Sequence, residues 1–436
     1  MSEIPFTQAQ INLIDKAVEW YKRITAGRAV KSFGEFCNQR NLSPDNRSSA
    51  LEYIAYSQRA GQKFQSQLVF KIFGFAGCGK TTIAREIEER TKAITAYIAQ
   101  TGKAASVLRK KGCEGAMTVC RFAFKPLGED DEGKPIFGPR LDPYTMPQLI
   151  VLDEGSMVGR REAQQLLTFG IPMIVLLDPA QLKPVASTAP FIDGEPDGWL
   201  TETKRNGGNI LRAAMYVREG KRLPDREYDD IQIRSRMPSL PELIDHSGLS
   251  AQILCARNKT RNRINRQVRA HLGFTHWLPM RGDKLIATCN DYGADVINGS
   301  QWIVLEDVEL SDDVPRYDVE FRKGPFADSE FFTSGPRGYV KVMSLDEPDR
   351  VTTLHINTDC FLEPDVSAKQ DAIRKEGFKQ YGGFDFGYAI TVHKSQGSEW
   401  DSVLYIEESI PGCEQQSLDY TGLTRAAKNL SWYRVK

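Results

Sequence analysis

The sequence lacks three features: paired cysteines, a net charge of either sign, and a long apolar run. Its eight cysteines are scattered without any C-x-x-C spacing, which argues against structural zinc and a disulfide framework and fits a reducing compartment. Lysine plus arginine and aspartate plus glutamate both number 57. A polyanionic partner would therefore have to meet a local basic groove, because a global positive field is absent.

No apolar run approaches the ~18–20 residues that a membrane span needs. The opening residues, MSEIPFTQAQ, also lack the basic-then-apolar order of a secretion signal. We therefore expect a soluble, cytoplasmic protein with no membrane partner. A hydrophobic content of 41% and a charged content of 26% are typical of globular proteins, and 436 residues predict two or more domains.

A glycine-rich turn at residues 74–82 follows an apolar run and precedes a helix-like segment. The turn matches G-x-x-x-x-G-K-[ST], in the strand-before, helix-after context that this motif needs. Its glycines let the backbone curl so that N–H groups cradle phosphates. Lys80 would reach the β- and γ-phosphates, and the Thr81 hydroxyl would bind Mg²⁺. These features together outweigh a chance turn, and the predicted nucleotide-binding residues are Gly74, Ala76, Gly77, Cys78, Gly79, Lys80, Thr81 and Thr82.

Two further apolar runs are followed by carboxylate or amide side chains, which are the groups that position metal and water in phosphate hydrolysis. The run 149–152 ends in Asp153 and Glu154, and in doubly wound α/β folds such a strand end lies beside the phosphate loop. We expect Asp153 to hold the Mg²⁺ shell and Glu154 to orient and deprotonate the attacking water. The run 173–177 leads to Gln181, whose amide would sense a γ-phosphate or a lytic water.

Three places allow a functional and an ordinary interpretation. Gln10, in the helix predicted over 8–25, has an amide that matches the N6/N7 edge of adenine, but it equally fits a solvated helical turn. Thr101 and Lys103 lie between a short strand and a helix, which makes either a seat for a DNA phosphate or an ordinary β-to-α turn. Phe137 flanks an acidic-tipped hairpin and is either an exposed wedge or part of the hairpin base.

The second half of the chain predicts another α/β unit with a β insertion. A strand precedes a basic helix at 258–271, which is the densest basic patch. From 283 to 361 the pattern becomes strand-like and predicts a small inserted antiparallel barrel. In the first half, residues 26–66 are polar and predict a surface insertion with a helix around 48–58, to which we assign no function.

Eight short strings, in order along nearly the whole chain, resemble the motifs of superfamily 1 helicases of the B subclass, close to the Dda-like and RecD-like DNA helicases. The strings are FTQAQ, GFAGCGKTT, QTGKAA, LDEGSM, LLDPAQLKPV, LTETKRN, ITVHKSQGSEWD and YTGLTRA. The resemblance implies an α/β fold of two RecA-like P-loop NTPase domains, with ATP and Mg²⁺ in the cleft between them and single-stranded DNA across both. It also implies an inserted β-hairpin pin that splits the duplex and an inserted small SH3-like β-barrel.

Domain boundaries follow from the same resemblance. The first RecA-like domain would span 1–197, with the surface insertion 26–66 and the pin at about 121–147. The second would combine 198–300 with 386–436, and the SH3-like subdomain would span 301–385.

The resemblance also implies residue roles, motif by motif. Lys80, Glu154 and Gln181 would form the catalytic set, with Arg205 and Arg425 as arginine fingers from the second domain that stabilise charge on the transferred phosphoryl group. Gln10 would read adenine, Gly397 would lie at the nucleotide, and Thr81 and Asp153 would hold Mg²⁺. The residues implied to contact DNA, mostly its phosphates, are Thr101, Lys103, Phe137, His393 and Lys394.

The function implied is that of an ATP-dependent DNA helicase that translocates 5′→3′ on single strands and unwinds duplex forks. The polarity depends on the resemblance alone. A functional monomer that works with replication, recombination or repair proteins would fit this reading. Two alternatives stay open: an RNA-directed helicase of the same subclass, and a nucleotide-gated DNA clamp or loader that does not unwind. The complete hydrolytic set argues against the clamp.

Overall fold

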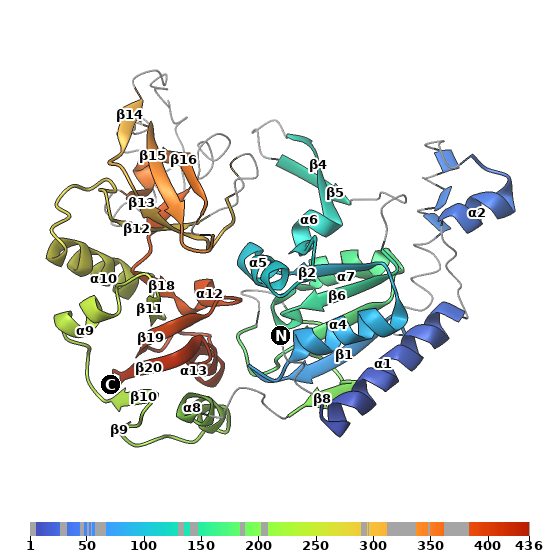
Figure 1. The fold of residues 1–436 in the computed structure, drawn as a ribbon, viewed down its shortest axis with the longest axis horizontal. Coiled ribbons are helices and arrows are strands. Elements are labelled where there is room, and N and C mark those ends of the chain that lie inside the picture. Colours follow the sequence, from blue (N-terminus) through green and yellow to red (C-terminus); the bar gives the residue numbers. More distant parts are fainter. Residues whose placement is uncertain are drawn as a thin grey trace, which may run out of the picture.

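Figure 1 shows the computed structural model, in which two α/β lobes lie side by side and a smaller antiparallel sheet and a β-hairpin project from the same side of the pair. We call the sheet formed between residues 69 and 200, with its helices, the first lobe. The sheet formed between residues 226 and 434, with its helices, is the second lobe. The structure describes residues 6–26, 33–43, 48–49, 52–53, 55–56, 67–129, 135–139, 147–183, 188–201, 208–288, 294, 296–311, 337–347, 349–361 and 383–435.

The first lobe is a six-stranded parallel sheet with the order β3-β2-β6-β7-β1-β8. Its central strands are continuous apolar runs because helices cover both faces, α1 and α4 on one and α6 and α7 on the other. Strand β8 pairs with β1, so this sheet extends past the expected boundary at 197. The elements are α1 Gln8–Ala26, β1 Val69–Gly74, α4 Lys80–Thr91, β2 Thr95–Ala99, α5 Gly102–Lys110, β3 Met117–Thr118, α6 Val119–Ala123, β6 Leu149–Asp153, η1 Gly155–Met157, α7 Arg160–Thr168, β7 Met173–Leu177 and β8 Gly198–Leu200.

The second lobe is also built on a six-stranded sheet, with the order β18-β11-β19-β20-β10-β9. All its pairings are parallel except that of β9 with β10. Helices α8 and α13 pack on one face and α9 and α10 on the other. The elements are α8 Asn209–Arg218, β9 Arg226–Glu227, β10 Ile231–Arg234, α9 Leu240–Asp245, β11 Ala251–Cys255, α10 Asn258–His271, β18 Ala389–Thr391, α12 Val392–Ser395, β19 Trp400–Glu407, α13 Gln415–Leu423 and β20 Ala426–Arg434.

The antiparallel sheet is inserted between α10 and β18 of the second lobe and has its own core around Trp302. Its order is β14-β15-β13-β12-β17, and β16 pairs with β15. Strand β12 joins this sheet well before the expected boundary at 301, because its backbone pairs with both β13 and β17. The elements are β12 Lys284–Ala287, β13 Gln301–Val304, β14 Glu309–Ser311, β15 Arg337–Ser344, β16 Val351–Asn357, η2 Thr358–Phe361 and β17 Phe384–Phe386.

The hairpin comprises β4 (Phe124–Glu129) and β5 (Pro135–Pro139), with a register shift between Pro126 and Gly128. Its tip at 130–134 lies outside the described residues. Within the 26–66 insertion, helix α2 (Phe33–Arg40) contributes Phe36 to a small aromatic cluster with Tyr53 and Tyr56. The described residues of the helix predicted around 48–58 are helical.

The longest described helix, α1, is amphipathic: it has 19 residues and carries charged side chains along its length. Across the described ranges, no helix combines the length and the apolar character that crossing a bilayer requires.

Candidate nucleotide and nucleic-acid site

The glycine-rich loop joins the end of β1 to the start of α4. Gly77 and Gly79 have φ angles of 77° and 82°, in the left-handed region that favours glycine. A Cβ at Gly74 would lie 2.6 Å from Cys78 Sγ, so the loop closes tightly at this end as well. Helix α4 begins at Lys80, directly after the loop, and directs its positive end toward it. The loop thus has the strand–turn–helix geometry that its sequence predicts.

The Lys80 side chain folds back over this loop. Its Nζ donates hydrogen bonds to the carbonyl oxygens of Gly74, at 2.7 Å, and Phe75, at 3.1 Å. Burial acts to lower the pKa of this ammonium group, but electrostatic interactions with Cys78, Asp178 and the neighbouring carboxylates outweigh it and raise the pKa. Lys80 therefore stays charged in a half-buried position.

Three adjacent strands, β6, β7 and β1, end at the same edge of the first sheet, and each brings a functional segment to it. Asp153 ends β6, Asp178 follows β7, and the loop follows β1. Burial, together with the charge of Glu154, raises the pKa of Asp153 to about 6, and Lys80 opposes the shift. This is the strand-end site that the sequence predicts, and Asp178 adds a carboxylate that sequence reasoning did not assign.

Several polar atoms at this edge are buried without a hydrogen-bond partner among the described residues. They include Glu154 Oε2, Ser156 Oγ and Gln181 Oε1. Glu154 also has a φ angle of 53°, a left-handed value that costs energy in a residue with a side chain. Unpartnered buried polar groups and a strained backbone together fit a site that completes its hydrogen bonds with a bound polar group.

The same residues fit a Mg²⁺–nucleotide complex. Mg²⁺ in such sites is held by one or two protein oxygens, phosphate oxygens and water, so the Thr81 hydroxyl and the Asp153 carboxylate would suffice. No group of three or more His, Cys, Asp or Glu side chains poised for a metal occurs in the described part of the chain. A bound Mg²⁺ would neutralise phosphate charge, which complements the Lys80 ammonium.

The second lobe contacts this edge directly. Thr421 Oγ1 accepts a hydrogen bond from the Leu182 N–H at 3.1 Å, and Gln396 Nε2 donates one to the Leu182 carbonyl at 3.1 Å. Phe75, in the loop, packs into the apolar core of the second lobe, under the Arg218 guanidinium at 4.0 Å. The nucleotide loop therefore lies where the two lobes meet.

Of the two predicted arginine fingers, Arg425 lies within the described residues and Arg205 does not. Arg425 is buried in the second lobe, where its guanidinium donates to the carbonyls of Thr421 and Ser398, each at 3.1 Å. It is close to the lobe boundary but is held by its own lobe in this arrangement. Arg205 lies outside the described residues.

Gln10 is buried, and its Oε1 accepts a hydrogen bond from the Thr7 N–H at 3.1 Å. The Thr7 hydroxyl in turn accepts from the Gln10 N–H at 3.4 Å, which makes a capping box at the start of α1. A contact between Gln10 and adenine stays a prediction.

Four of the five residues predicted to bind DNA lie on or next to α5 and α12, and the fifth, Phe137, lies in the hairpin. Thr101 caps α5 and accepts a hydrogen bond from the Ala104 N–H at 3.1 Å. A Cβ at Gly397 would lie 2.8 Å from the Ala104 Cβ, so Gly397 packs against α5. A contact between Gly397 and the nucleotide stays a prediction. His393 and Lys394 lie on α12, and partial burial lowers the pKa of the His393 imidazole. Phe137 is in β5, paired with Pro126.

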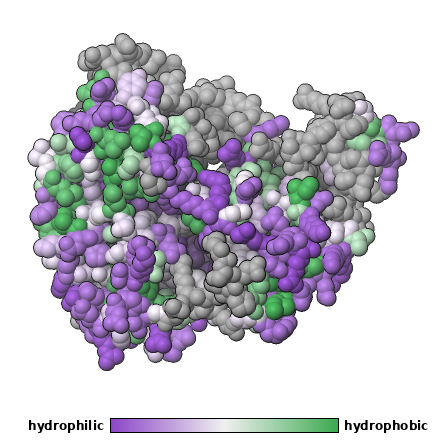
Figure 2. All heavy atoms as spheres, viewed as in Figure 1, coloured by the Kyte–Doolittle hydropathy of each residue, from purple (hydrophilic) through white to green (hydrophobic). Residues whose placement is uncertain are grey.

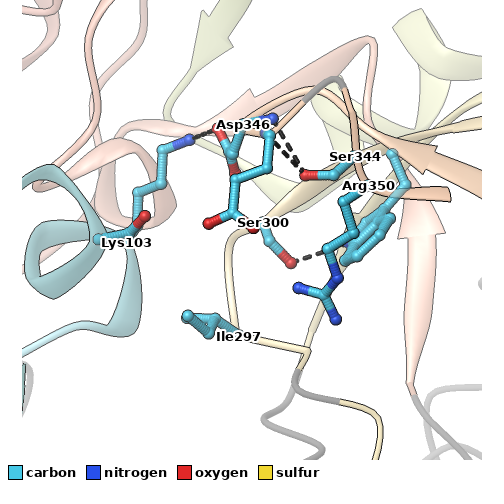
Figure 3. A pocket seen from close by; sticks show the side chains of 9 residues that line it. Lys103, Ile297, Ser300, Ser344, Asp346 and Arg350 are labelled. Carbon is cyan, nitrogen blue, oxygen red and sulfur yellow. Dashed lines mark hydrogen bonds and ion pairs between the residues drawn. The ribbon is translucent and has the colours of Figure 1, made fainter. Parts of the chain in front are cut away.

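Figure 3 shows Lys103 extending from α5 toward Asp346, and the two side chains form an ion pair. The pocket beside them has a volume of about 20 Å³, which suits a water molecule and not a base. The pocket is therefore a small gap in the contact between α5 and the antiparallel sheet. Figure 2 shows that the visible walls of the hollow between the lobes are mostly hydrophilic.

Comparison with protein families gives two matches. A family described as an AAA domain matches residues 57–229, and a family described as a UvrD-like helicase C-terminal domain matches residues 386–431. The first match covers the nucleotide loop and the strand ends of the first lobe. The second covers α12 and α13, the helices of the second lobe that face them.

Two curated relatives are similar along most of the chain. A probable conjugal transfer protein TraA from Sinorhizobium fredii is 22% identical over 91% of this chain and 33% of its own length. The ATP-dependent RecD2 DNA helicase of Deinococcus radiodurans is 25% identical over 81% of this chain and 45% of its own length. The chain thus spans less than half of the length of either relative.

Among solved structures, a structure of Pif1 helicases at forked double-stranded DNA is similar in fold. The TM-score is 0.50 and the identity 17%, over 86% of this chain and 91% of the other. The likeness extends to the parallel sheets of both lobes.

Proposed function

We propose that this chain is a superfamily 1B helicase, similar to the RecD-like proteins, and that it is an ATP-dependent DNA helicase that translocates 5′→3′ on single-stranded DNA and unwinds duplex. The observation that carries this proposal is the position of the nucleotide loop. Phe75 packs into the core of the second lobe, while Lys80 and Asp153 lie in the first. A nucleotide at this junction would interact with both lobes and could alter how they close.

In this proposal Lys80 and the loop amides bind the phosphates, and Thr81 and Asp153 hold Mg²⁺. Glu154 orients and deprotonates the attacking water, and the buried amide of Gln181 reads the γ-phosphate. Arg425 and Arg205 stabilise the charge of the transferred phosphoryl group from the second lobe. For Arg425, this requires its guanidinium to leave the Thr421 and Ser398 carbonyls when the nucleotide binds.

Single-stranded DNA would cross both lobes over Thr101 and Lys103 on one side and His393 and Lys394 on the other. Each nucleotide state would hold the two lobes at a different spacing, so one ATP cycle would move the protein along the strand. The hairpin β4–β5, with Phe137, would act as the pin at the fork. The antiparallel sheet would be the SH3-like subdomain, and the protein would work as a monomer beside replication, recombination or repair proteins.

The polarity is tested with two duplexes that carry a single-stranded tail at either the 5′ or the 3′ end. We expect ATP-dependent strand separation only with the 5′ tail. A preference for the 3′ tail would overturn the polarity, and binding without separation of either duplex would favour the clamp. The RNA-directed alternative stays open because backbone contacts discriminate weakly between the two sugars. It is tested by replacing the DNA tail with RNA: strand separation that prefers the RNA tail would favour it.

A further inference from the structure

One hydroxyl group of the second lobe bridges two parts of the nucleotide site in the first. Tyr420, on α13, is fully buried. Its O–H donates a hydrogen bond to Asp178 Oδ2 at 2.7 Å, and the same oxygen accepts one from the Ala76 N–H at 3.3 Å. Asp178 follows β7, and Ala76 is inside the glycine-rich loop. The bridge therefore joins α13 to both the loop and the neighbouring strand end.

The partners of Tyr420 belong to the nucleotide site. Asp178 is fully buried, and its charge is one of those that keep the nearby Lys80 ammonium protonated. Burial raises the pKa of Asp178, while the charge of Lys80 and the hydrogen bond from Tyr420 oppose this shift. Ala76 belongs to the glycine-rich loop, whose other amides would face a bound polyphosphate. Tyr420 thus holds two groups whose environment changes when a nucleotide binds.

The residue expected to act on the nucleotide from the second lobe, Arg425, follows directly after helix α13 and its C-cap Thr424. The Arg425 guanidinium donates to the carbonyl of Thr421, the residue after Tyr420, at 3.1 Å. Thr421 itself accepts from the Leu182 N–H. Any shift of Tyr420 relative to Asp178 would therefore move the backbone to which Arg425 is anchored.

We propose that Tyr420 is a positioning residue, which holds α13, and through it Arg425, in register with the phosphate loop and Asp178. This inference rests on the proposed ATP hydrolysis. It adds a direct protein link between the lobes, beside the link that the nucleotide itself would form. The hydrogen bond from Tyr420 is stronger than one between neutral groups, because its acceptor is a buried carboxylate to which few other groups donate. The remaining donor to Asp178 among the described residues is the Ala180 N–H, at 3.1 Å.

The test compares Tyr420→Phe with Tyr405→Phe. Tyr405 is a matched control: it is fully buried, and its hydroxyl donates at 2.5 Å to the buried Asp419, but both residues belong to the second lobe. Each substitution removes one hydroxyl and keeps the ring. Steady-state ATP turnover is measured with saturating single-stranded DNA for both variants and the wild type, together with their unfolding midpoints.

We expect Tyr420→Phe to lower kcat by about tenfold or more, with the KM for ATP changed by less than about threefold, because the lost contact positions groups for the transition state. Tyr405→Phe should keep the wild-type kcat, even though both variants lose similar stability. Equal kcat values in all three proteins, or an equal loss in both variants, would overturn the inference. If the wild type itself shows no turnover stimulated by DNA, the proposed function fails first, and that outcome is distinct.

Discussion

Lys103, near the start of α5 in the first lobe, forms an ion pair with Asp346, in the turn between β15 and β16 of the antiparallel sheet. Both side chains are mostly buried, with exposures of 13% and 16%. Lys110 reinforces the contact by donating to the Asp346 carbonyl. Lys103 is a residue proposed to bind a DNA phosphate, so the Asp346 carboxylate competes with DNA for the same cation.

Replacing Asp346 with Asn should therefore tighten binding of single-stranded DNA. Removing one competing negative charge beside a phosphate-binding lysine is expected to raise the affinity by about threefold to tenfold at low salt, and by less as salt increases. Fluorescence anisotropy with a labelled oligonucleotide measures both effects.

Glu306→Gln is the matched control for Asp346→Asn. Glu306 also pairs with a lysine of the antiparallel sheet, Lys341 at 2.6 Å, but this pair is exposed and does not involve α5. We expect no change in DNA affinity for the control. Equal affinities for Asp346→Asn and the wild type would show that Lys103 does not bind DNA in the proposed way.

A second prediction concerns Gly397, which packs against α5. Its φ angle is 74°, and an added Cβ would meet both the Ala104 Cβ at 2.8 Å and the Thr101 Oγ1 at 3.0 Å. Gly397→Ala should lower the free energy of unfolding through backbone strain, by about 1 kcal/mol, and through the clash, by a further 1–3 kcal/mol or so. Denaturant unfolding measures the sum.

Gly412→Ala separates these two contributions. Gly412 has a φ angle of 77°, but nothing lies within 4 Å of its added Cβ, so only the strain remains. The Gly397 variant should lose clearly more stability than the Gly412 variant. If the two lose the same amount, the contact between Gly397 and α5 is not tight.

A pH dependence of stability follows from Lys284 in β12. Burial, with a contribution from the nearby Lys103, lowers the pKa of the Lys284 ammonium to about 7, from a model-compound value of 10.5. Between these two values the unfolded chain binds a proton that the folded chain has released. The contribution of Lys284 to the free energy of unfolding therefore rises with pH from about 7 to about 10.5 and is constant below 7.

Lys284→Met should remove this rise. Urea unfolding of the wild type and the variant at a series of pH values from 6 to 10 or so checks it, because the difference between the two curves isolates this group. The difference should grow with pH in favour of the wild type. A difference that is independent of pH would mean that Lys284 keeps its proton in the folded state.

Local signals in the sequence predicted the strands of the first lobe and the position of the polar side chains at its edge. The apolar runs that become β6 and β7 are buried on both faces, and each ends in a carboxylate at the same sheet edge. The glycines at 77 and 79 take the left-handed angles that their motif requires. These features depend on spacing within a few residues, and so they can be read directly.

Contacts between distant segments could not be read in this way. Nothing near Tyr420 in the sequence indicates that its hydroxyl meets Asp178, and nothing near Asp346 indicates that it meets Lys103. Strand β12 lies within the 283–361 stretch predicted to be strand-like, but the expected boundary at 301 left it in the second lobe, because its pairing with β13 and β17 is not visible in its own sequence. Asp178 could have been identified from the sequence by the rule that identified Asp153, because both carboxylates come at the end of an apolar strand.

The central claim is that ATP turnover at the loop is coupled to DNA. The most direct measurement is steady-state ATP turnover by the wild type, Lys80→Ala and Glu154→Gln, each with and without single-stranded DNA, with nucleotide binding measured in parallel. We predict strong stimulation by DNA in the wild type and its loss in both variants, with nucleotide binding retained by Glu154→Gln because that side chain acts on the water and not on the phosphates. Wild-type turnover that is indifferent to DNA, or stimulated turnover that survives Lys80→Ala, would contradict the account.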